Sequence, residues 1–198
     1  MKRLSVVSLA LLFLLVSTQP LLAAARNWEM DKAHTNFYFT IDHIYSKIRG
    51  HFNEYSGEVK FDPKNLADSK FLFKIETASI DTGVAKRDKH LQSADFFNVD
   101  KFPLMTFEST KITDAGNGLY NVLGKFTVKG EEYELLLPLT LAGIKDHPAV
   151  KGKEVIGFNG KITIDRLAYK VGDGKFFNLG VVGKDVEILV SIEALADK

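Results

Sequence analysis

The residues best suited to chemistry in this sequence form a short charged cluster, KRDKH, near the middle of the chain. A proton-transfer centre would require Arg87, Asp88 and His90 to converge on a nucleophile, and no triad-like order is present. The alternative is a structural role, in which Asp81 or Thr82 caps a helix. Charge-assisted hydrogen bonds, donated by Arg87 and accepted by Asp88, would then hold that helix to the loop that follows. We expect the structural role for this cluster.

The histidines are the second group that could do chemistry, as metal ligands or as general bases. They are His34, His43, His51, His90 and His147. A structural zinc site needs about four converging ligands, but no two histidines have the close spacing of paired ligands and the chain contains no cysteine. The sequence therefore predicts no metal ion, no cofactor and no catalytic residue. Without cysteine there is also no disulfide framework, so the hydrophobic core alone must stabilise the fold.

We expect the elements that position these residues to be β-strands, because hydrophobic side chains alternate with polar ones along most of the chain. Alternation with a period of two is typical of half-buried β-strands. Turn signals separate the alternating segments, notably Asn117-Gly118 and Lys129-Gly130. The predicted strands cover residues 34–42, 51–61, 70–80, 104–112, 119–128, 131–141, 154–165 and 186–192.

Three segments interrupt the alternation. We expect a short helical turn over residues 43–49, a helix over residues 84–93 and a glycine-rich aromatic loop over residues 166–184. Because the strands are joined mostly by short antiparallel connections, the predicted fold is all-β. It is a single eight-stranded antiparallel barrel with a short helix between strands 3 and 4. A barrel of about eight strands has room for side chains or for one small ligand.

The N-terminus has the pattern of a cleaved secretory signal peptide. The pair Lys2-Arg3 precedes a long apolar run, and the small residues Ala23 and Ala25 supply a cleavage site. The run is shorter than the ~20 residues that a membrane-spanning helix needs. We therefore expect residues 1–25 to be removed and residues 26–198 to form one exported, soluble domain in the periplasm.

Charge and composition limit the partners. Without Lys2 and Arg3, acidic residues outnumber basic residues by one, and no basic stripe is present, so no nucleic-acid partner is expected. The chain contains 15 phenylalanines and one tryptophan. Phenylalanine rings carry no polar group, so they either line a dry apolar cavity or fill a solid core. The composition alone does not choose between these two arrangements.

Five segments together resemble one known family. They are HTNFYFTIDH, GHFNEYSGEVKFDP, SIDTGVAKRDKHLQSADFFNVDKFPLMTFEST, LGKFTVKGEEYELLLPLTLAG and VEILVSIEAL. The third is the most specific, because many unusual residues recur in it at fixed spacing. On these segments, which span nearly all of residues 26–198, the chain resembles the YceI-like family. One departure is Thr35, where serine often follows the histidine.

The resemblance implies an extended lipocalin-like barrel that holds a long amphipathic lipid, either a polyisoprenoid or a fatty lipid such as an amide. It also implies a periplasmic or secreted protein, a link to stress responses, and homodimers in some members. No catalytic residues are carried over from the family. The expected function is storage or transport of such a lipid, with transient membrane contact.

With this resemblance, the inward faces of the strands become a lipid tunnel. The loop from Tyr169 to Leu179 is its predicted mouth, and Leu91, Phe96 and Phe97 are expected to close one end of the barrel. The predicted ligand-binding residues are Phe37, Phe39, Ile41, Phe71, Phe73, Ile75, Met105, Phe107, Tyr120, Phe126, Leu137, Phe158, Tyr169 and Phe176.

Two other functions remain open from the sequence. One is an enzyme that modifies an isoprenoid or acyl lipid, with His34, His43 or His90 as its base. The other is a sealed barrel that acts as a stress-related interaction protein. Lipid turnover would identify the enzyme, and a solid core would support the sealed barrel.

Overall fold

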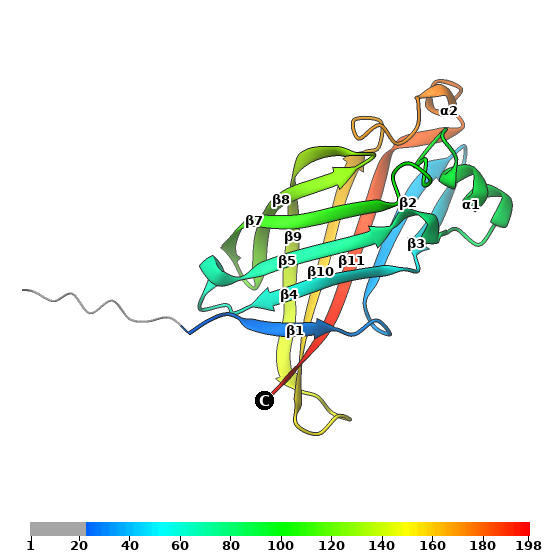
Figure 1. The fold of residues 1–198 in the computed structure, drawn as a ribbon. Coiled ribbons are helices and arrows are strands. Elements are labelled where there is room, and N and C mark those ends of the chain that lie inside the picture. Colours follow the sequence, from blue (N-terminus) through cyan, green and yellow to red (C-terminus); the bar gives the residue numbers. More distant parts are fainter. Residues whose placement is uncertain (1–22) are drawn as a thin grey trace, which may run out of the picture.

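Figure 1 shows the computed structural model, which describes residues 23–198. Most of the predicted signal peptide, residues 1–22, lies outside the described residues. Within residues 23–198, no helix is both long enough and apolar enough to cross a membrane. The strands are β1 (Arg26–Met30), β2 (Asn36–His43), β3 (Ser46–Phe52), β4 (Tyr55–Phe61), β5 (Lys70–Glu76), β6 (Ile80–Asp81), β7 (Leu104–Gly116), β8 (Leu119–Val128), β9 (Glu131–Asp146), β10 (Lys153–Asp165) and β11 (Val182–Asp197). The helices are α1 (Ala85–Gln92) and α2 (Lys175–Asn178), with 3₁₀ turns at Leu66–Asp68 and Thr77–Ser79.

Eight strands close into an antiparallel barrel in the order β1–β4–β5–β7–β8–β9–β10–β11, and β11 pairs back with β1. This confirms the predicted all-β, eight-stranded antiparallel barrel. Closure pairs the backbone groups that a sheet edge would leave free, and thereby removes a site of edge-to-edge association.

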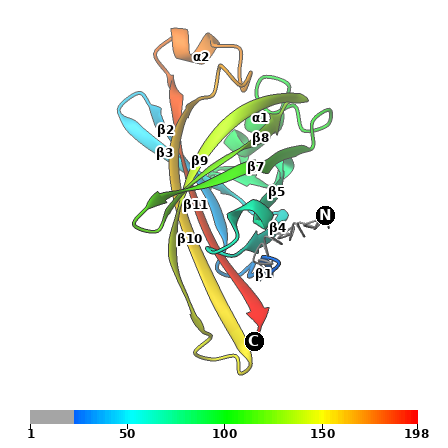
Figure 2. The same ribbon diagram turned by 90° about the vertical axis from the view of Figure 1, so that its left-hand side faces the viewer.

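The last strand, β11, belongs to two parts of the wall. Ala194 and Leu195 pair with β1, whereas residues 182–191 pair with β2. The β2–β3 hairpin and the short strand β6 therefore extend the wall at one end of the barrel. Both views place α1 and α2 toward this end and the β9–β10 connection at the opposite one (Figures 1 and 2). We call the end with the two helices the helical end.

Most of the predicted elements are confirmed. β8 spans the predicted residues 119–128, and α1 lies within the predicted helix. Asn117-Gly118 and Lys129-Gly130 have the positive φ angles that tight hairpins require. Alternation and turn chemistry therefore predicted the antiparallel order of the strands correctly.

The predicted helical turn over residues 43–49 is wrong. β2 and β3 form a hairpin there, in which His43 pairs with Ser46 and Ile44 has a φ of 49°. Ladder hydrogen bonds to β2 hold the backbone extended, and this tertiary pairing overrides a weak local pattern. The short strand β1 was not predicted, because five residues with one buried side chain give little alternation.

Two other predicted boundaries differ from the structure. The strand predicted over residues 70–80 ends at Glu76 and is followed by a 3₁₀ turn and β6. The strand predicted over residues 51–61 divides into β3 and β4 around Asn53-Glu54.

The part of the barrel that β1 closes has a solid core. Phe61, Phe71 and Phe158 are almost fully buried, at 1%, 0% and 0% exposure. Their ring centroids lie 4.9 to 5.9 Å apart, and Tyr120 packs edge-on against Phe61 at 5.0 Å. Aromatic rings at these distances contribute dispersion and quadrupole attraction beyond their burial. The core thus occupies one half of the barrel.

Candidate ligand-binding cavity

A cavity of about 570 Å³ lies in the half of the barrel next to the helical end. Strands β2, β3, β5, β6, β7, β8, β9, β10 and β11 line it, together with α1 and the segments around Phe96 and α2. No described residue of β1 or β4 is part of the lining. The cavity and the solid core therefore follow one another along the barrel.

The strand arrangement explains why this half is hollow. Here β2, β3 and β6 take the place of β1 and β4 in the wall, and the interior of a barrel widens as strands are added. The strand pairings of the described residues include no ladder between β6 and β7. Leu91 of α1 and Phe97 pack against the buried side chains at this position and cover the gap. Helix and loop thus complete a wall that strands alone leave open.

All but three of the predicted ligand-binding residues line this cavity. Those that do are Phe37, Phe39, Ile41, Phe73, Ile75, Met105, Phe107, Phe126, Leu137, Tyr169 and Phe176. The exceptions, Phe71, Tyr120 and Phe158, point inward but belong to the solid core. Alternation along a strand predicts which face is inside, but not how far along the barrel the residue lies. That these residues bind a ligand stays a prediction.

The sequence prediction missed many residues of the lining. Several follow the same alternation on β10 and β11 and could have been found by it: Ile162, Ile164, Val186, Ile188 and Val190. Others come from irregular segments and give no periodic signal: Val84, Val171 and Val181. The charged members Lys86, Arg87 and Arg166 were not predicted to reach the cavity.

Helix α1 is held to the segment before it, not to the loop after it as predicted for Arg87 and Asp88. Asp88 accepts hydrogen bonds from the backbone N–H of Thr82, at 2.9 Å, and from its hydroxyl. Arg87 donates from Nε to Thr82 Oγ1 at 2.7 Å and from Nη2 to Thr82 O at 2.8 Å. The predicted cap by Asp81 or Thr82 is wrong, because the helix begins after Val84 without a side-chain cap. The structural role of the cluster is nevertheless clear from these bonds.

A cluster of three aromatic side chains, His90, Phe96 and Phe176, lies at the helical end. The His90 ring meets Phe96 and Phe176 edge-on, with centroids 5.1 and 5.6 Å away, while Phe96 and Phe176 stack at 6.0 Å. His90 Nε2 lies 2.9 Å from a carboxylate oxygen of Asp95. All three rings line the cavity, as does Tyr169, whose pKa is raised by burial. Phe176 of the predicted mouth therefore packs against Phe96 of the predicted end cap.

The cavity lining is mostly apolar, and most of its other members are basic side chains. Its charged members are Lys86, Arg87 and Arg166, and His43 and His90 also reach it. No aspartate or glutamate of the described chain is part of the lining. Cationic groups thus have no carboxylate partner inside the cavity itself.

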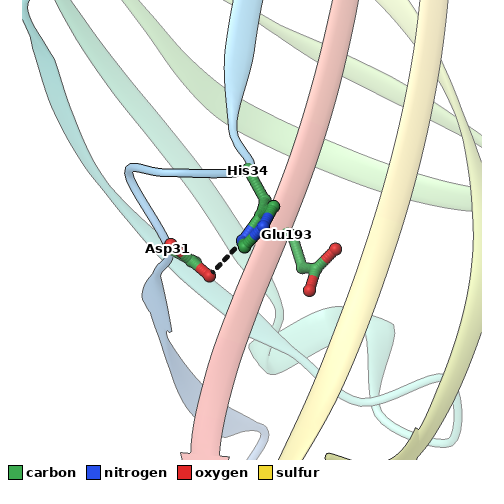
Figure 3. A group of neighbouring side chains, drawn as sticks. All are labelled: Asp31, His34 and Glu193. Carbon is green, nitrogen blue, oxygen red and sulfur yellow. Dashed lines mark hydrogen bonds and ion pairs between the residues drawn. The ribbon is translucent and has the colours of Figure 1, made fainter. Parts of the chain in front are cut away.

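His34, one of the three suggested bases, lies outside the cavity lining. It belongs to the turn after β1, where its Nδ1 lies 2.7 Å from Asp31 Oδ2 (Figure 3). This hydrogen bond lowers the pKa of Asp31 and raises the pKa of His34. Glu193 of β11 completes a group whose ligand atoms lie within 4.8 Å of one another, of residue types that could hold a metal ion.

The Asp31–His34 pair braces the turn between β1 and β2. Asp31 also accepts a hydrogen bond from the backbone N–H of Ala33 at 2.9 Å. The next residue, Thr35, is fully buried and exchanges hydrogen bonds of 3.0 and 3.1 Å with the backbone of Glu193. These contacts attach the turn to β11 and give the group a structural role.

Known proteins resemble this chain in sequence and in fold. A UPF0312 protein of Vibrio parahaemolyticus is 37% identical over 155 residues, which cover 77% of this chain and 81% of that protein. A UPF0312 protein of Pectobacterium atrosepticum is 34% identical over 195 residues, 98% of each chain. The crystal structure of BcnA from Burkholderia cenocepacia is similar with a TM-score of 0.75 and 29% identity, covering 84% of this chain and 99% of BcnA.

A more distant structure shares the fold. A domain from Saccharophagus degradans, described as polyisoprenoid binding, matches with a TM-score of 0.64 at 13% identity over 87% of this chain and 99% of that domain. The family model of the YceI-like domain matches residues 28–194, which include every strand of the barrel in whole or in part. The chain therefore belongs to the YceI-like family.

Proposed function

We propose that this protein binds a long-chain amphipathic lipid, most simply a polyisoprenoid, for storage or transport. The observation that carries the proposal is the cavity of about 570 Å³, whose lining is almost entirely aliphatic and aromatic. Its volume lies within the range of roughly 300–1,000 Å³ of small-molecule sites. The family membership supports the same function, and the Saccharophagus degradans domain demonstrates only that the fold is compatible with it.

The energetics suit a hydrocarbon chain. Burial of each CH₂ group contributes ~0.8 kcal/mol, so a five-carbon unit contributes roughly 3–4 kcal/mol before the cost of ordering the chain. A few such units would bind without any strong polar contact. Aromatic side chains such as Phe39 and Phe107 supply contact area on opposite parts of the wall.

Native mass spectrometry of protein stripped with organic solvent and then offered a polyisoprenoid tests this function. Leu135 and Leu136 are neighbours on β9, but Leu135 lines the cavity and Leu136 is 48% exposed. We expect Leu135→Trp to reduce lipid uptake at least tenfold, because the larger indole projects into the path of the lipid chain, while Leu136→Trp leaves uptake unchanged. The proposal is contradicted if the wild-type protein takes up no long-chain lipid, or if the two substitutions have equal effects.

A lipid-modifying enzyme is the second candidate, because His43 and His90 both reach the cavity. Its test is turnover of isoprenoid or acyl substrates by the wild type and by His90→Ala. Loss of turnover with lipid uptake intact would favour the enzyme. Membership of the YceI-like family favours lipid binding over catalysis. The cavity of about 570 Å³ is evidence against the third alternative, a sealed barrel with a solid core.

We also propose that the protein acts in the periplasm after removal of residues 1–25, with a role in stress response. Transient membrane contact is supported by exposed apolar side chains at the helical end, where Tyr45 is 102% and Leu179 is 65% exposed. Homodimer formation rests on the family resemblance alone. N-terminal sequencing of the exported protein tests the cleavage, vesicle flotation tests the membrane contact and light scattering tests the homodimer. Loss of stress resistance in cells that lack the protein tests the role in stress response.

A further inference from the structure

We propose that the bound lipid ends in an anionic head group, a phosphate or a carboxylate, and that Arg166 receives it at the helical end of the cavity. This inference rests on the proposed lipid-binding function. It narrows the ligand from long-chain lipids in general to those whose polar end is an anionic oxygen acceptor.

Arg166 is a buried cation with an incomplete set of partners. It directly follows β10 and is only 5% exposed. Its Nε donates to the carbonyl of Gly183 at 2.9 Å, and its Nη1 donates to the carbonyl of Val171 at 2.7 Å. Its Nη2 is buried and has no hydrogen-bond partner among the described residues. Arg166 is part of the cavity lining.

An unpaired guanidinium in such a place is costly. Burial of a charge without a counter-charge costs several kcal/mol in order-of-magnitude terms, and an unsatisfied buried donor adds to this cost. Burial accordingly lowers the pKa of Arg166, and the charges of Asp165 and Asp173, which form no direct ion pair with it, only partly oppose this shift. Two carbonyl groups supply dipoles but no negative charge. An anion at Nη2 would remove the deficit, and arginine suits phosphate or carboxylate because its donors match the geometry of both.

The nearby carboxylates are engaged elsewhere. Asp165 accepts from Lys184 Nζ at 3.0 Å, and Asp173 accepts from the backbone N–H of Lys175 at 2.9 Å. On the helix side Asp88 is bonded to Thr82 and Asp95 to His90. None of these four carboxylates is in the cavity lining. The acids of the helical end therefore leave Arg166 without a direct ion pair.

Other cationic groups lie at the same end. Lys86 and Arg87 of α1 reach the lining, as do the imidazoles of His43 and His90. Because the lining of the described chain holds no aspartate or glutamate, the charges of Lys86 and Arg87 add to the attraction of Arg166 for an anion. The hydrocarbon tail would extend from there between the apolar walls formed by β5, β8 and β10.

The guanidinium is also held in place. Phe96 lies over it with the Arg166 Cζ 5.8 Å from the ring centroid, and Phe96 itself stacks on Phe176. Gly172 has a φ of +94°, and a Cβ at this residue would collide with Arg166 Nη1. The loop therefore passes directly over the side chain. A group fixed in this way loses little conformational entropy when it binds a ligand.

Matched pairs of lipids test the inference on solvent-stripped protein. Geranylgeranyl phosphate is compared with geranylgeraniol, and hexadecanoate with hexadecanol, by native mass spectrometry and by displacement of a fluorescent lipid. We expect the wild type to bind the anionic member of at least one pair ten or more times tighter, and the pair that shows it distinguishes phosphate from carboxylate. Higher ionic strength should reduce this preference.

Substitution of the arginine should abolish the preference but not the affinity for the tail. Arg166→Met should bind the two members of each pair equally, with alcohol binding retained as evidence of an intact cavity. Arg166→Lys should keep part of the preference. Lys161→Met, on the preceding strand β10 with a side chain 62% exposed, is the control and should behave as the wild type. Lys86→Met should reduce the preference by a smaller factor than Arg166→Met.

The outcomes separate this inference from the proposed function. If wild-type protein binds alcohol and anion equally, the head-group assignment fails while lipid binding stands. If it binds neither, the proposed function itself fails. If Arg166→Met does not fold, Arg166→Lys tests the role of Arg166, and a preference equal to that of the wild type would overturn this role. The wild-type preference and its salt dependence still test the head-group assignment. An undiminished preference in a folded Arg166→Met protein would overturn the role of Arg166.

Discussion

His34 and Arg166 are two basic side chains in opposite surroundings. The His34 side chain is 63% exposed and pairs with Asp31, whereas Arg166 is 5% exposed and retains a free donor. In water the His34 pair costs little to form, and its effect is to order a turn. Inside the barrel an unpaired donor is expensive, and a site that tolerates it is a candidate for ligand recognition. Burial, not residue type, distinguishes the two roles.

The titration of His34 gives a test of the turn. Its hydrogen bond to Asp31 raises the pKa of His34 above 6.5 and lowers that of Asp31 below 3.8. The stabilisation from His34 is thus complete below pH 6.5 and is lost as the pH rises through the raised pKa. That from Asp31 is complete above pH 3.8 and is lost as the pH falls through the lowered pKa. The pair therefore contributes most between these two limits.

NMR titration of the His34 ring measures this coupling. We expect Asp31→Asn to move the His34 pKa down toward 6.5, because the charged acceptor is gone. Glu29→Gln, a substitution on neighbouring β1, should leave the pKa of His34 where it is. An unchanged His34 pKa in Asp31→Asn would contradict the assigned cause.

Helix α1 and the loop of residues 93–103 act at the scale of elements. Thr82 bonds both Arg87 and Asp88 and thus holds the start of α1. The Lys129-Gly130 turn supports the loop from the other side, since Lys129 Nζ donates to the carbonyl of Phe96 and Gly130 lies close to the Phe102 ring. Together they hold the cap over the cavity.

Removal of the Thr82 hydroxyl should loosen this cap. Thr82→Ala deletes one acceptor for Arg87 and one donor to Asp88, which we expect to cost about 1–2 kcal/mol locally. Hydrogen exchange over residues 82–92 should become faster, and lipid exchange should become faster with it. Thr82→Ser keeps the hydroxyl and should behave as the wild type. Equal exchange in the alanine and serine variants would contradict the role of the hydroxyl.

The whole molecule divides along the barrel into a packed half and a hollow half. Phe158 is fully buried between Phe61 and Phe71, whereas Phe39 borders the cavity. A ring that faces empty space lacks neighbours on that side and gains less dispersion energy. The most tightly packed rings and the cavity therefore lie at different levels of one barrel, with core residues such as Phe37, Phe73 and Phe107 at the boundary between them.

Two matched substitutions measure this division in lipid-free protein. We expect Phe158→Ala to lower the free energy of unfolding in urea by about 3–5 kcal/mol, as for other buried phenylalanines. Phe39→Ala should cost less, about 1–2 kcal/mol, because part of its surroundings is already empty. The order of lipid affinity should be reversed, with the larger loss in Phe39→Ala. Equal losses of stability would contradict a hollow half.

The sequence by itself determined the β-architecture and the family. Alternation needs only neighbouring residues, so Phe37, Phe39 and Ile41 could be assigned to an inner face, and the Asn117-Gly118 turn could be assigned to a hairpin. The same local information predicted one helix among strands. It could not predict β1, whose few residues alternate too little.

The tertiary structure decided where along the barrel each inward residue lies. Phe71 and Phe73 alternate identically on β5 and both belong to the core, yet only Phe73 also lines the cavity. Only the assembled wall, with β2 and β3 in place of β1 and β4, creates the space. Arg166 likewise shows no periodic signal, because its burial and its free donor depend on Val171, Gly183 and Phe96. The position of a residue along the barrel and the residues that it contacts depend on segments that are distant in the sequence. Local periodicity therefore cannot predict them.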